Sequence, residues 1–129
     1  MKHLKILITF LLFFSLFTPT LNAMPAEQMK KILGMTQNSW VSFRDFNGKQ
    51  LIYFTHLEAY TCGIKEVHYS INTDALDKVW TLQPCQDDGI STIKKDLIML
   101  HLALGTAKSI DVQLTFIDGT KSEVLHKKP

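Results

Sequence analysis

This chain of 129 residues lacks most of the features that mark a catalytic or metal-binding protein. It contains no GxSxG, HExxH, GxGxxG or Walker-type sequence, and its two cysteines are too far apart to form a CxxC pair. We therefore expect no catalytic residues, no cofactor, no metal and no enzymatic activity. The chain also lacks a cluster of lysine and arginine, which excludes nucleic acid and an anionic membrane surface as partners.

An apolar run long enough to cross a membrane is also missing. The run at residues 6–17 is shorter than the roughly 20 residues that a spanning helix needs. Two lysines precede it, a proline follows it, and residues 21–23 end in alanine, which is typical of a secretory signal peptide. We predict that residues 1–23 are cleaved and that an exported, lipid-free protein begins at Met24. It would be periplasmic or extracellular, with no membrane insertion.

Charge of either sign is not in excess once that segment is removed. Lys2 and Lys5 leave with it, so twelve of the 14 basic residues remain beside all 12 acidic residues. The remaining residues suffice for one small domain. Pro25 and Gly34 bound a helical pattern, so we assign residues 24–38 to a short helix and lead-in, and residues 39–129 to the main domain.

Two cysteines in an exported chain favour a disulfide. Cys62 and Cys85 have no other thiol to pair with, and small exported domains commonly need such a crosslink. Closing a loop of this size stabilises by about 3 kcal/mol in the chain-entropy model. The alternative, a nucleophilic or metal-binding Cys62, has no supporting motif.

Residues 51–72 form the centre of the predicted fold, as two strands separated by Cys62-Gly63. Asn47-Gly48 predicts a two-residue hairpin turn before them. That turn sets the register, and we expect the apolar pairs that it creates to face the core. These pairs are Phe46 with Lys49, Phe43 with Ile52, and Val41 with Phe54. Beyond Thr55 the alternation shifts by one residue, which we interpret as a β-bulge near His56.

Further strands are predicted at residues 78–82, 110–116 and 123–126 from alternating apolar positions. Residues 91–104 are ambiguous, because they are rich in helix formers yet alternate from Ile98 to Leu104; we prefer a strand at 97–104. About seven strands in one small domain indicate an all-β, antiparallel immunoglobulin-like sandwich with a short N-terminal helix.

Two segments carry a family resemblance. GIKEVHYSIN and, downstream, SIDVQLTFIDGTKSEV resemble strands of the immunoglobulin-like modules of bacterial secreted proteins, of which the chitobiase carboxy-terminal type is the nearest. The resemblance covers about 26 residues. It implies a β-sandwich and no catalytic function.

The predicted hairpin register also suggests a binding face. It places Trp40, Arg44 and Tyr53 on the side opposite the core, and exposed aromatic rings with an arginine suit a carbohydrate or protein partner. The alternative is that the N-terminal helix or a long loop covers this side as ordinary core. We expect a small secreted binding module. The other functional hypothesis is a small exported enzyme or metal-dependent protein that uses His56, His68 and acidic neighbours such as Glu58.

Overall fold

The computed structural model describes residues 24–86 and 89–129, so the predicted signal segment lies outside the described residues. In this part of the chain seven strands form two antiparallel sheets, ordered β1-β2-β5 and β4-β3-β6-β7. The strands are β1 (Ser42–Phe46), β2 (Lys49–Tyr53), β3 (Ile64–Ile71), β4 (Lys78–Trp80), β5 (Met99–Ala103), β6 (Ile110–Phe116) and β7 (Leu125–Lys127). The predicted all-β sandwich with a short N-terminal helix is confirmed.

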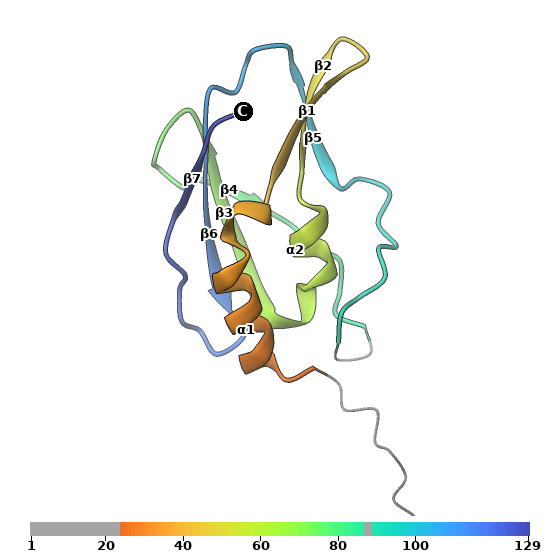
Figure 1. Ribbon diagram of the computed structural model, residues 1–129, viewed down its shortest axis with the longest axis vertical. Coiled ribbons are helices and arrows are strands. Elements are labelled where there is room, and N and C mark those ends of the chain that lie inside the picture. Colours follow the sequence, from red (N-terminus) through yellow and green to blue (C-terminus); the bar gives the residue numbers. More distant parts are fainter. Residues whose placement is uncertain (1–23, 87–88) are drawn as a thin grey trace, which may run out of the picture.

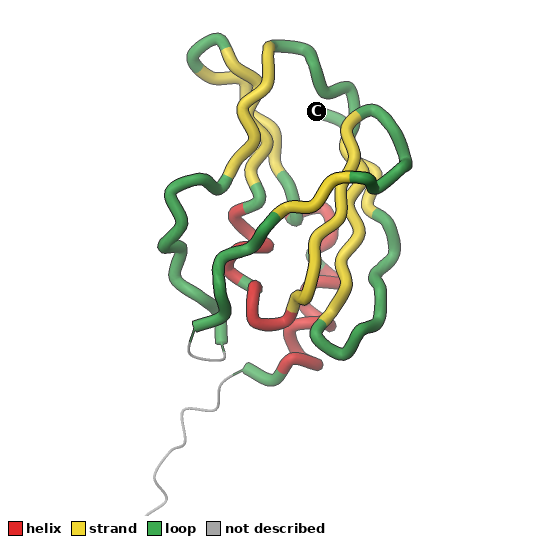
Figure 2. The backbone as a smooth tube through the Cα atoms, turned by 180° about the vertical axis from the view of Figure 1, so that it is seen from behind, coloured by secondary structure: helices red, strands yellow, loops and turns green. Residues whose placement is uncertain are grey.

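The two sheets lie side by side, with the helices at one end and the β1–β2 turn projecting from the other (Figures 1 and 2). In the constant-type immunoglobulin order the fourth strand extends the sheet of the first, second and fifth strands. Here β4 pairs antiparallel with β3 instead. The β1-β2-β5 sheet therefore keeps only three strands, with β1 and β5 at its edges.

The first hairpin has the predicted turn and register. Asn47 and Gly48 have positive φ values of 56° and 74°, as a type I′ turn requires. Phe43 lies opposite Ile52, and Arg44 opposite Leu51. The prediction that Phe46 faces the core is wrong. It lies three positions after Phe43, so alternation places the two rings on opposite faces, and Phe46 is 52% exposed.

The predicted bulge near His56 is also wrong. The strand ends at Tyr53, and the chain continues as α2 (Thr55–Ala59) and a 3₁₀ turn, η2 (Thr61–Gly63), before β3 begins. Helical spacing brings Leu57 to the core and also buries Glu58. Of the ambiguous segment 91–104, Met99–Ala103 is the strand β5, and no part of it is helical.

The core contains aromatic rings from three parts of the chain. Phe54 stacks on Trp80 with ring centroids 4.2 Å apart, and Tyr69 lies 5.5 Å from Phe54. The helix α1 (Ala26–Met35) adds Met29 and Leu33 to the buried set. It packs closely against η2, since a β-carbon on Gly63 would lie 2.8 Å from the Met29 β-carbon.

Trp40 belongs to this core and is not on an exposed face. It is 1% exposed, and its indole N–H donates a 2.9 Å hydrogen bond to the Leu33 carbonyl at the end of α1. The chain turns through the 3₁₀ segment η1 (Gln37–Ser39) immediately before it, so strand alternation does not extend back to this position. Trp40 is therefore removed from the predicted binding face.

The disulfide between Cys62 and Cys85 is confirmed, with Cα atoms 4.6 Å apart. It joins η2 to the segment that follows β4. The same segment is held by the fully buried Glu58 carboxylate, which accepts hydrogen bonds from the Trp80 indole and the Gln83 backbone, at 2.8 Å each. The long connection from β4 to β5 is thus attached to α2 and η2 by both covalent and polar contacts.

Candidate binding face

The outward side of the β1-β2-β5 sheet is a three-by-three array of side chains. Arg44, Leu51 and His101 form the middle row, because each lies opposite the next across the three strands. The row on one side holds Ser42, Tyr53 and Met99, and the row on the other holds Phe46, Lys49 and Ala103. We call these nine residues the first-sheet face.

Leu51 forms the floor of this face. It is only 5% exposed, although strand alternation places it on the outward side of the sheet. The side chains around it line a hollow of about 470 Å³. The lining residues are Arg44, Phe46, Asn47, Lys49, Leu51, Tyr53, Met99 and His101.

The first-sheet face carries positive charge without an acidic counterpart. Its fixed cations are Arg44 and Lys49, and no aspartate or glutamate lines the hollow. Among the described residues neither cation, nor His101, forms an ion pair. The Arg44 guanidinium instead lies over the Phe46 ring, 4.3 Å from its centroid, which restricts its position through a cation–π contact.

The structure brings Arg44 and Tyr53 together on one face, as the hairpin register predicted, and it excludes Trp40. The sequence prediction missed Phe46, Met99 and His101. Phe46 could have been found from its two-residue spacing to Arg44. Met99 and His101 come from β5, whose pairing with β2 joins segments about 50 residues apart, and no local pattern indicates that pairing.

The outward side of the other sheet differs in composition. Its residues, which we call the second-sheet face, are Glu66, His68, Ser70, Val79, Asp111, Gln113, Thr115 and His126. Both of its acidic side chains meet a histidine: Glu66 lies 3.2 Å from His68, and Asp111 contacts His126. Polar groups on this face are thus largely paired with one another.

The residues proposed for metal or acid–base chemistry do not form one site. The Glu58 carboxylate is fully buried and already engaged in contacts that include an ion pair to Lys95 at 3.1 Å. His68 lies on the second-sheet face. His56 Nε2 is 2.9 Å from the Thr36 hydroxyl, and burial lowers the pKa of His56. No group of three His, Cys, Asp or Glu side chains in residues 24–86 and 89–129 is arranged to hold a metal ion.

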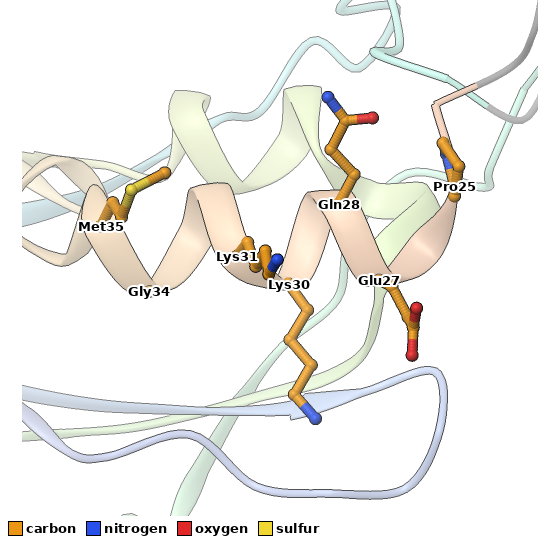
Figure 3. A pocket seen from close by; sticks show the side chains of 7 residues that line it. All are labelled: Pro25, Glu27, Gln28, Lys30, Lys31, Gly34 and Met35. Atoms are coloured by element: carbon orange, nitrogen blue, oxygen red, sulfur yellow. The ribbon is translucent and has the colours of Figure 1, made fainter.

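A hollow of about 800 Å³ also lies along α1 and is lined by residues of that helix and Pro25 (Figure 3). Lys30 extends away from the other lining side chains toward the turn after β6 (Figure 3), where it donates hydrogen bonds to Asp118 and Thr120. A surface formed by one helix brings no side chains together from other elements. The first-sheet face, to which three strands contribute, is the better candidate.

The fold and this face define a small disulfide-linked β-sandwich with one amphipathic, cationic side. No family model, no curated protein and no solved structure matches the chain. The resemblance to immunoglobulin-like secreted modules therefore stays a prediction. Among the helices that the structure describes, none is both long and apolar enough to cross a membrane.

Proposed function

We propose that this protein is an exported, non-enzymatic binding module that holds its partner on the first-sheet face. The observation that carries the proposal is the hollow around Leu51, where exposed aromatic, aliphatic and cationic side chains converge from three strands. Such a mixture is typical of interfaces, which are enriched in aromatic residues, methionine and arginine.

Export is supported by two independent features. Residues 1–23 have the composition of a secretory signal. The Cys62–Cys85 disulfide fits an oxidising compartment, because thiols are kept reduced in the cytosol. The binding partner would then be a glycan or a protein of the periplasm or the cell exterior.

The test compares one substitution on each outward face. Phe46→Gln removes an exposed ring from the first-sheet face, and Val79→Gln removes a similarly exposed apolar side chain, 59% accessible, from the second-sheet face. The purified exported proteins are titrated with a panel of glycans and with purified envelope and secreted proteins. We expect Phe46→Gln to weaken binding about tenfold and Val79→Gln to leave it unchanged.

Equal binding by both variants and the unsubstituted protein, for every ligand that binds, would show that the first-sheet face is not the binding site. Thermal unfolding of each variant serves as the folding control. Both substitutions replace exposed side chains, so each should change the free energy of unfolding by less than about 1 kcal/mol.

A further inference from the structure

We propose that the occupant of the first-sheet face is a sugar unit that carries a carboxylate, as in an acidic glycan. This inference rests on the proposed function and names the chemistry of the ligand at that site. Its grounds are the uncompensated charge of the hollow, the fixed position of Arg44, and the apolar surface beside it.

The charge of the hollow favours an anion. Arg44 and Lys49 both line it, while the neighbouring acid on β1, Asp45, is on the opposite side of the sheet by strand alternation. Two cations in a hollow that no acidic side chain lines raise its positive potential, so an anionic ligand is attracted to the hollow and offsets the repulsion between the two cations.

The geometry of Arg44 suits a carboxylate. Its guanidinium is held 4.3 Å above the Phe46 ring, so less side-chain freedom is lost when it binds a ligand. A guanidinium presents parallel N–H groups that match the two oxygens of a carboxylate. His101 lies across Leu51 from Arg44 and offers a further hydrogen-bonding group on the other wall.

The apolar surface beside Arg44 favours a sugar ring. Tyr53 is a diagonal neighbour of Arg44 on adjacent strands, a placement that separates the side-chain bases by about 7 Å. Tyr53, Met99 and the Leu51 floor line the same hollow as Arg44 and supply part of its apolar surface. A sugar ring has an apolar C–H face and a polar rim. One sugar unit can therefore rest on this surface and extend its carboxylate to Arg44.

The same face is poorly suited to an extended peptide. A peptide that adds to a sheet is held by backbone hydrogen bonds at a strand edge. The backbone of β2 is already paired on both sides, with β1 and with β5, so the centre of the face offers only side chains. A ligand recognised through its own ring and charged substituent fits that surface better.

The test uses calorimetric titration of the exported, disulfide-linked protein with three probes: oligogalacturonate, its methyl-esterified form, and poly-L-glutamate. Oligogalacturonate supplies a carboxylate on every sugar ring, the ester keeps the ring and removes the charge, and poly-L-glutamate keeps the charge without a sugar. We expect oligogalacturonate to bind most tightly, with an affinity that falls as salt is added.

Variants then locate the carboxylate contact. Arg44→Gln should weaken oligogalacturonate binding about tenfold or more, because it removes a charged hydrogen-bond donor. Lys65→Gln is the matched control: it removes one positive charge from an exposed residue of β3 and should leave binding unchanged. Thermal unfolding confirms that both variants are folded.

Each alternative outcome overturns the inference in a recognisable way. Equal binding of the ester would exclude a carboxylate contact, and equal binding of poly-L-glutamate would indicate charge recognition without a sugar. If no probe binds while Phe46→Gln still abolishes binding of another ligand, the acidic-sugar inference fails and the proposed function stands. If no ligand is sensitive to Phe46→Gln, the proposed function fails as well.

Discussion

The two sheets turn chemically different faces to solvent. On the second-sheet face, Glu66 meets His68 and Asp111 meets His126, so both acidic groups have a partner within the face. On the first-sheet face, Arg44 rests on an aromatic ring and Lys49 forms no ion pair among the described residues. Exposure alone does not distinguish the faces, because each carries one prominent apolar side chain, Phe46 or Val79.

The faces differ in whether their charged side chains have a polar partner on the same face. A face whose acidic groups already have hydrogen-bonding partners gains little from a ligand, since the ligand would have to replace contacts that already exist. A face with unpaired cations around an apolar floor gains both charge pairing and apolar burial when it is covered. The comparison therefore supports the proposal that the first-sheet face is the binding face, and the following changes test that proposal.

The largest loss of stability should come from replacing Trp40, which belongs to the core and not to the first-sheet face. Trp40→Ala should lower the free energy of unfolding by about 4 kcal/mol, because it leaves a cavity and removes the hydrogen bond from the indole to the Leu33 carbonyl. Arg44→Ala should cost less than about 1 kcal/mol. Urea unfolding followed by fluorescence measures both. Equal stability of the two variants would indicate that Trp40 is exposed on the outward face, as the sequence pattern predicts.

Removal of the disulfide should have the next largest effect and should act mainly on the first sheet. Replacing Cys62 and Cys85 by serine should cost about 3 kcal/mol. The bond anchors the connection that leads into β5, an edge strand of the first-sheet face, whereas β6 lies inside the other sheet. Hydrogen exchange should therefore show a greater loss of protection in β5 than in β6. Equal losses in both strands would contradict this local role.

Truncation of Leu51, at the floor of the hollow, should destabilise the protein less than truncation of its core neighbour Ile52. Leu51→Ala should cost about 2 kcal/mol, since Leu51 lines an open hollow whose other side chains can close over the smaller residue. Ile52→Ala, one residue away on the buried side, should cost about 3 kcal/mol. Thermal melts rank the two. A larger loss for Leu51→Ala would mean that the first-sheet face is packed as core and not open.

Local signals in the sequence were enough to predict part of this architecture. Asn47-Gly48 specified the hairpin register, because few residue pairs adopt two successive positive φ values. Unbroken alternation specified β6, and the presence of only two cysteines in a chain with a signal-like start specified the disulfide. Each of these features depends on residues close in sequence or on simple counting.

Features that depend on distant packing were not predictable in the same way. The five-residue helix α2 is too short for its periodicity to be distinguished from that of a strand, so it was interpreted as a bulge. The burial of Trp40 depends on how α1 docks. The candidate face was only half identified, because β5 reaches β2 from about 50 residues away.

The smallest effect concerns stability in acid. It tests whether the contacts of Asp118, in the turn after β6, stabilise the folded protein. The Thr120 side chain, then its backbone N–H and then Lys30 donate hydrogen bonds to Asp118 and lower the pKa of that carboxyl from 3.8 to about 2. A lowered pKa means that the folded state favours the charged form. The resulting stabilisation is complete above about pH 4 and is lost as the pH falls toward 2.

Asp118→Asn should therefore show a thermal midpoint that depends less on pH between about 4 and 2 than that of the unsubstituted protein. The difference should be small and should shrink in high salt, because the carboxylate is exposed to solvent. Asp45→Asn is the control, since Asp45 is exposed on β1 and forms no ion pair among the described residues. If Asp45→Asn flattened the profile as much as Asp118→Asn, the acid sensitivity would not come from the contacts of Asp118 with Thr120 and Lys30. The contrast between paired and unpaired charges would then lose this support.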